Sequence, residues 1–201
     1  KSKPTAFAAI LILIIVMASA GIRGASAEGA RVRDGQRFFP RADLMTIGVY
    51  YYPEHWPRGQ WDRDLKNIAA MGFEFTHFAE FAWALLEPAP GRFDFAWLDE
   101  AVGLAAKHGL KVILCTPTPC PPAWMGERDP EIFLVGADGR RMEHGTRGNA
   151  SLSSNAFLAY TRAIVTELAK RYGRDARVWG WQIDNEPWAP PDYSPAARRK
   201  F

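Results

Sequence analysis

The choice of fold depends on the stretch TIGVYYYPEHWP, residues 46–57. Its first seven residues are mostly β-branched or aromatic and predict a buried strand. The turn that follows, residues 53–57, is bulky and contains no glycine. A doubly wound nucleotide-binding sheet usually has a glycine-rich phosphate turn at this point. A turn without glycine cannot bring its backbone against a diphosphate, so this stretch favours a (β/α)8 barrel over an open doubly wound sheet.

Strand and helix patterns alternate along the rest of the chain. The expected strands are 46–52, 73–78, 111–116 and 178–183, and the expected helices run from Trp61 towards Gly72, from Trp97 towards Gly109, and from a cap at Ser153, Ser154 or Asn155 to Gly173. Residues 119–153, rich in proline, glycine and charge, predict an elaborated loop. Strands and helices that alternate in units of about 35 residues indicate βαβ units with a parallel sheet. We therefore expect an α/β fold, with about the first four units of a (β/α)8 TIM barrel.

The charge distribution argues against a nucleic-acid-binding protein. The net charge of +3 comes from Lys1, Lys3 and Arg23, which lie in a 27-residue start without Asp or Glu. Without these three, 22 basic residues balance 22 acidic ones. A formally neutral body offers no electrostatic reason to bind nucleic acid or an acidic membrane.

The first 27 residues have the pattern of a secretory signal peptide. Lys1 and Lys3 precede an apolar stretch, residues 6–20, and Ala25-Ser26-Ala27 is a small-x-small cleavage site. The apolar stretch is shorter than the ~20 residues that span a bilayer. We expect a signal peptide at 1–27, a catalytic domain at 28–201, and an exported protein that leaves the membrane after cleavage. An uncleaved N-terminal anchor is the alternative.

The cysteines predict neither a metal site nor a redox centre. Cys115 and Cys120 have no zinc-motif spacing, and Cys115 lies within an expected strand, where it would be a small buried residue. We expect no cofactor and no metal.

The stretch WQIDNEP, residues 181–187, is the strongest candidate for chemistry. An apolar run, 178–183, gives way to Asp184, Asn185 and Glu186, as expected where a buried strand ends at a cleft. Glycoside hydrolysis needs two carboxyl groups, one of which protonates the leaving oxygen. Glu186 could be that acid, since Trp181 and Trp188 could give it the apolar surroundings that favour a protonated carboxyl. The alternative is a capping or surface carboxylate.

Two further carboxyl groups follow expected strands. Glu54 and Glu80 could contact a sugar, or could pair with a basic residue at the barrel rim.

Five stretches in register resemble the N-terminal part of the family-42 glycoside hydrolases, the β-galactosidases. They are GVYYYPEHW (48–56), AEFAW with LEP (79–88), GRFDF (91–95), TPT with PPAW (116–124) and GWQIDNE (180–186). The resemblance implies a (β/α)8 catalytic domain, a retaining mechanism and terminal non-reducing β-D-galactose residues as substrate. It implies that Glu186 is the proton donor and that Asn185 and Arg147 bind substrate. For Arg147, the alternative is a solvated loop charge.

The chain departs from this family in two places. Many members have a zinc-binding cysteine four residues after the arginine, whereas this chain has Ser151, which agrees with the expected lack of a metal. Pro187 replaces a common aromatic residue, and Asn-Glu-Pro also occurs in family-5 cellulases and mannanases. A β-glucoside or β-mannoside substrate therefore stays open.

The resemblance also implies that the nucleophile follows a seventh strand, and no glutamate follows Glu186 here. We expect a fragment that lacks the nucleophile and is itself inactive. A truncated, non-catalytic product is the alternative, and oligomerisation is left open.

Overall fold

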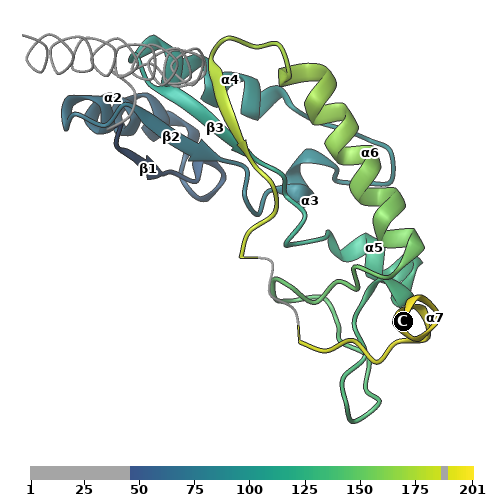
Figure 1. Ribbon diagram of the computed structural model, residues 1–201. Helices are drawn as coiled ribbons and strands as arrows, with labels where there is room; N and C mark the ends of the chain where they lie inside the picture. The colour runs from purple at the N-terminus through teal and green to yellow at the C-terminus, as the bar shows by residue number, and fades with distance from the viewer. Residues whose placement is uncertain (1–45, 187–189) are drawn as a thin grey trace, which may run out of the picture. The chain divides into compact units, whose positions relative to one another are not determined.

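Four parallel strands form one sheet in the order β1-β2-β3-β4 (Figure 1). They are β1 (Gly48–Tyr50), β2 (Phe75–Phe78), β3 (Lys111–Cys115) and β4 (Val178–Gln182). In this computed structural model, residues 46–186 and 190–201 are described, so the predicted signal peptide lies outside them. A doubly wound sheet reverses its strand order at a switch point. Here the order follows the sequence, as in the first four units of a (β/α)8 barrel.

A long helix follows each of the first three strands. These helices are α2 (Trp61–Ala70), α4 (Ala96–Lys107) and α6 (Asn155–Tyr172). Shorter elements are η2 (Pro53–His55), η3 (Arg58–Gln60), α3 (Trp83–Leu86), α5 (Ala123–Arg128), η4 (Pro130–Ile132) and α7 (Pro195–Lys200). The predicted alternation is confirmed, and the predicted loop at 119–153 contains α5 and η4. Among the described residues, no helix is both long and apolar enough to cross a membrane.

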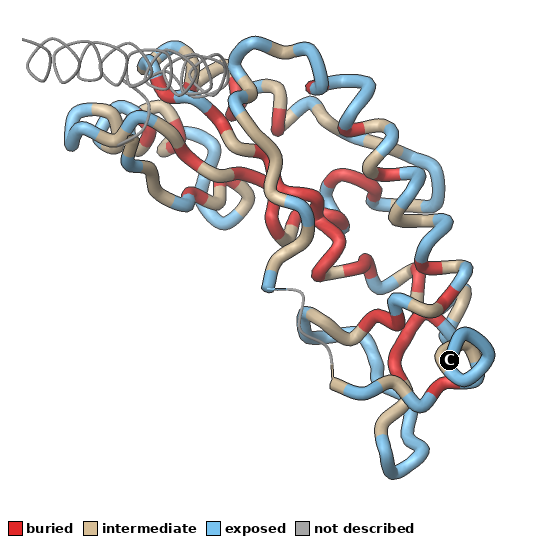
Figure 2. The backbone as a smooth tube through the Cα atoms, viewed as in Figure 1, coloured by how far each residue is buried: buried red, intermediate tan, exposed pale blue. Residues whose placement is uncertain are grey.

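The three long helices pack their apolar sides on one face of the sheet, and Figure 2 marks the buried residues of the strands and helices in red. Phe78, Val112 and Leu114 project from the strands into this core. Ile164 and Leu168 of α6 are fully buried there, as their helical spacing predicted. Burial of each such side chain contributes roughly 1.5–3 kcal/mol, so this core holds the strand ends in place.

Ser154 is the N-cap residue of α6. The sequence had left the cap open between Ser153, Ser154 and Asn155. The Ser154 side-chain oxygen accepts a hydrogen bond from the backbone N–H of Phe157, and the residue is 1% exposed. A capping serine satisfies one of the amides that the first turn of a helix leaves unpaired.

The opposite face of the sheet, which we call the open face, carries Tyr50, Phe75, His77 and Ile113. The rings of Tyr50 and His77 lie 4.3 Å apart. β4 has one extra residue at this face, because Val178 pairs with Val112 whereas Gly180 pairs with Ile113. The skipped residue is Trp179, which is 43% exposed and lies 6.0 Å from the Phe75 ring. This is a β-bulge.

Candidate active site

The backbone turns sharply after β4, where the sequence analysis placed the catalytic residues. Asp184 and Glu186 have positive φ angles of 58° and 44°. A non-glycine residue in this region is held at a cost of about 1–3 kcal/mol, and such strain is concentrated at functional sites. The turn therefore needs compensating contacts, and they come from the end of β3.

Asp184 supplies those contacts. Its Oδ2 accepts a hydrogen bond from Thr118 Oγ1 at 2.7 Å, and its backbone N–H donates to Thr116 Oγ1 at 2.7 Å. Its Oδ1 accepts from the backbone N–H of Asn185 at 2.6 Å. These three bonds fix the turn from both sides, so Asn185 and Glu186 project from a defined position.

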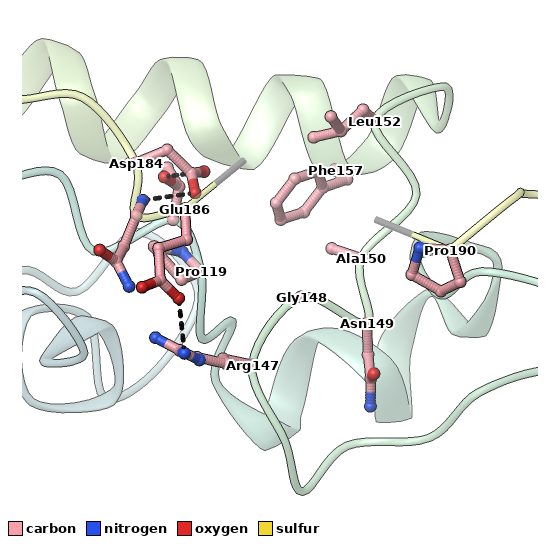
Figure 3. Close-up of a pocket in the computed structure, with 12 residues that line it drawn as sticks. Pro119, Arg147, Gly148, Asn149, Ala150, Leu152, Phe157, Asp184, Glu186 and Pro190 are labelled. Carbon is pink, nitrogen blue, oxygen red and sulfur yellow. Dashed lines mark hydrogen bonds and ion pairs between the residues drawn. The ribbon is translucent and has the colours of Figure 1, made fainter. Parts of the chain in front are cut away.

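Arg147 reaches the same place from the loop before α6. Its Nη2 donates to Glu186 Oε2 at 2.7 Å, as the dashed line in Figure 3 shows. The guanidinium also lies over the Phe81 ring, 5.8 Å from its centroid. The structure thus brings together the three residues that the resemblance singled out, Arg147, Asn185 and Glu186.

These residues line a pocket of about 360 Å³ (Figure 3). One side carries the polar residues Thr118, Asp184, Asn185, Glu186 and Arg147, and the other side is mostly apolar, with Leu152 and Phe157 beside the polar Asn149. A few convergent polar groups beside an apolar wall are typical of a small-molecule site.

Glu186 itself lies in different surroundings from those expected. The sequence analysis placed it in an apolar environment, but its side chain is 71% exposed and ion-paired. Trp181 pairs with Leu114 on the helix-covered face of the sheet, away from Glu186, and Trp188 lies outside the described residues.

The two other strand-end carboxyl groups are buried rather than open to the pocket. Glu80 is 4% exposed and accepts a hydrogen bond from the Tyr52 hydroxyl at 2.5 Å. Both carboxyl oxygens of Glu54 are buried and have no hydrogen-bond partner among the described residues. Burial raises the pKa of Glu54. In the part of the chain that the structure describes, neither group is ion-paired with a basic residue, so the rim ion pairs considered for them are not seen there.

Cys115 is packed in the interior and Ser151 is held by a hydrogen bond. Cys115 is fully buried, as predicted, and burial raises the pKa of its thiol to about 12, which keeps it protonated. Ser151 donates a hydrogen bond to Asp192 Oδ2 at 2.5 Å. Within residues 46–186 and 190–201, no three His, Cys, Asp or Glu side chains are grouped as metal ligands.

Sequence reasoning missed the residues that hold the site. Asp184 and Gln182 were quoted in the motif without a role, and Tyr50 was assigned only to a strand. Gln182 contacts Asn185, and the Tyr50 hydroxyl donates to Gln182 at 2.7 Å across the sheet. The only signal in the sequence was their position next to strand ends.

The chain is similar to known β-galactosidases over most of its described length. The family model described as β-galactosidase, that of glycoside hydrolase family 42, matches residues 50–201. The chain is 49% identical over 140 residues to β-galactosidase BgaA of a Thermus species, covering 70% of this chain and 22% of that protein. It is 45% identical over 142 residues to β-galactosidase Bga of Halorubrum lacusprofundi, covering 71% and 20%.

Solved structures agree. The β-galactosidase of the psychrophilic Marinomonas ef1 superposes with a TM-score of 0.72 at 37% identity, covering 76% of this chain and 24% of that one. The chain spans about a fifth of the length of the curated relatives that it matches. With its singly wound parallel sheet and the Asn-Glu pair after β4, this chain belongs to glycoside hydrolase family 42, the β-galactosidase family.

Proposed function

We propose that this chain contributes the acid/base side of a retaining β-galactosidase that removes terminal non-reducing β-D-galactose residues. The observation that carries the proposal is the pocket in which Asn185, Glu186 and Arg147 converge at the end of β4. The family and the names of its relatives support galactosides as the substrate class.

In this mechanism Glu186 first protonates the leaving oxygen, and then, as a carboxylate, takes a proton from the attacking water. The ion pair with Arg147 fits the ionised form that the second step uses. Asn185 binds a sugar hydroxyl beside the reacting carbon. Retention also needs a nucleophilic carboxylate about 5 Å from the acid, a role that we assign to none of the described residues.

A leaving-group comparison in the full-length protein tests the role of Glu186. Glu186→Ala should nearly abolish cleavage of lactose, whose leaving group needs a proton. It should spare the first step with 2,4-dinitrophenyl β-galactoside, whose leaving group does not. Glu127→Ala, at an exposed position on α5, is the matched control and should leave both rates unchanged. Equal losses on the two substrates would rule out general acid catalysis by Glu186.

The sugar is tested with aryl β-galactoside, β-glucoside and β-mannoside at matched leaving groups. The galactoside should have the highest kcat/KM. A preference for glucoside or mannoside would replace the galactoside assignment, and no hydrolysis of any glycoside by the full-length protein would support the non-catalytic alternative.

The proposal includes export. The pattern of residues 1–27 supports cleavage after Ala27. Mass spectrometry of the exported protein should therefore find Glu28 at its N-terminus. A mature protein that retains residues 1–27 would instead support the anchor.

A further inference from the structure

We propose that Gln182 and Tyr50 are positioning residues that fix the orientation of the Asn185 side-chain amide, so that its NH2 group faces the substrate. The inference rests on the proposed function for the identity of the substrate. It rests on hydrogen-bond chemistry alone for the orientation, because the oxygen and nitrogen of an amide have nearly the same shape and only their partners distinguish them.

The backbone carbonyl of Asp184 settles the orientation of Gln182. A carbonyl oxygen can only accept, so the amide atom of Gln182 that lies 3.1 Å from it must be the donor Nε2. Oε1 of Gln182 then points the other way, where the Tyr50 hydroxyl donates to it at 2.7 Å. In the flipped orientation Oε1 would face the Asp184 carbonyl oxygen, an acceptor against an acceptor, so only the present orientation satisfies both ends of the amide.

Gln182 in turn settles the orientation of Asn185. Its Nε2 also lies 3.1 Å from the Asn185 amide, and since Nε2 can only donate, the atom that it meets is Oδ1. Nδ2 of Asn185 is then on the opposite side of the amide. Asn185 lines the pocket together with Glu186, so this NH2 group is available to a ligand there.

The hydrogen-bonded chain Tyr50–Gln182–Asn185, which we call the relay, is supported from the open face of the sheet. Gln182 of β4 pairs with Cys115 of β3, and Tyr50 of β1, three strands from β4, lies beside His77. Burial lowers the pKa of His77. The Gln182 side chain lies on the same face of the sheet as Tyr50 and His77.

A fixed NH2 donor has a chemical consequence. The 2-hydroxyl of the sugar is next to the reacting carbon, and its hydrogen bonds strengthen in the oxocarbenium-like transition state. An amide held with Nδ2 towards this oxygen is already in the productive orientation, whereas a freely rotating amide presents its carbonyl part of the time. Gln182 and Tyr50 would thus act on the reaction through Asn185 without touching the sugar.

The test uses the full-length protein and three aryl β-galactosides with the same leaving group: the parent sugar, its 2-deoxy form and its 6-deoxy form. Gln182→Glu keeps the shape but replaces the donor with an acceptor, so the Asn185 amide should rotate to donate to it. Tyr50→Phe removes only the hydroxyl. The matched controls are Gln60→Glu, outside the pocket before α2, and Tyr193→Phe, at an exposed position.

The wild type should lose at least about tenfold in kcat/KM with the 2-deoxy sugar, which is the value of one hydrogen bond. In Gln182→Glu this 2-deoxy loss should shrink to under about threefold, with Tyr50→Phe in between. The 6-deoxy loss should be the same in every variant, and the controls should match the wild type. An unchanged 2-deoxy loss in Gln182→Glu, or an equal drop on all three sugars, would overturn the proposal.

Two arms keep the relay separate from the substrate assignment. If the wild type cleaves no galactoside, the proposed function fails. The relay is then tested by the same comparison with an aryl β-glucoside and its 2-deoxy form. A measurement without turnover is hydrogen exchange of the Gln182 side-chain amide by NMR, assigned by its absence in Gln182→Glu. Exchange should be faster in Tyr50→Phe than in the wild type, and equal exchange would overturn the role of Tyr50.

Discussion

Arg147 Nη2 lies 2.7 Å from Glu186 Oε2, although the two side chains are 51% and 71% exposed. An ion pair this open to water contributes only about 0–1 kcal/mol to stability. Its effect is therefore positional, since it joins the loop before α6 to the turn after β4, 39 residues away.

Arg147→Ala should leave folding intact and reduce catalysis. We expect its free energy of unfolding to change by less than about 1 kcal/mol, and kcat/KM for aryl galactosides to fall by at least about tenfold through loss of a charged hydrogen bond. Arg140→Ala is the control, since Arg140 lies in the same loop and is 90% exposed. Denaturation and initial rates measure the two effects, and a variant with full activity would contradict the substrate role.

Ser154→Ala should destabilise the protein because it removes the cap of α6. The expected cost is about 1 kcal/mol in urea denaturation. Ser153→Ala is the matched control one residue earlier, since its side chain does not cap the helix. If the two variants lost equal stability, the cap would not be specific to Ser154.

Glu87→Ala should be costly because Glu87 is a buried acceptor, 2% exposed. Its carboxylate accepts from Trp83 Nε1 and from the backbone N–H of Gly91, both at 2.9 Å. Removal leaves the buried Trp83 Nε1 without its acceptor, at about 1–3 kcal/mol, and also removes the bond to the exposed Gly91. Chemical denaturation should show this loss, while Glu143→Ala, at an exposed position, should be near neutral.

Asp99→Asn should change how stability depends on pH. The hydrogen bond from Arg171 is the main cause that lowers the pKa of Asp99, with a further bond from the Tyr172 hydroxyl. A lowered pKa means that the stabilisation is fully present above the unfolded pKa of about 3.8 and is lost as pH falls through the folded value.

The wild type should therefore exceed Asp99→Asn in stability at pH 6, and the gap should narrow as pH falls through the lowered pKa of Asp99. Thermal unfolding over a series of pH values from 6 downwards measures the difference. Asp138→Asn is the control, because the Asp138 side chain is 62% exposed. A gap between wild type and Asp99→Asn that stays constant with pH would contradict the assignment.

Much of the fold could be predicted because it depends on local patterns. The apolar spacing of α6 and the glycine-free turn after β1 are readable along the chain, and both led to the correct elements. The strands proved shorter than predicted at their ends: β1 occupies 48–50 within the predicted 46–52. Terminal residues depend on pairing with a neighbour, which a sequence pattern does not show.

The site was predictable only in part. Glu186 was found because a carboxyl after a buried strand is conspicuous, but its exposure was not foreseen, since sequence neighbours such as Trp181 point to the other face. The roles of Asp184 and Gln182 depend on partners 66 and 132 residues away, Thr118 and Tyr50. Contacts of this kind appear only once the strands are side by side.

The extra residue in β4 determines which of its side chains lie on the open face of the sheet. Side chains alternate along a strand, so an unbulged β4 that starts with Val178 towards the helices would place Trp181 on the open face and Gln182 in the core. Because Trp179 is skipped in the pairing with β3, this parity is reversed, and Gln182 pairs with Cys115. One inserted residue thus exchanges an indole for an amide three positions before Asn185.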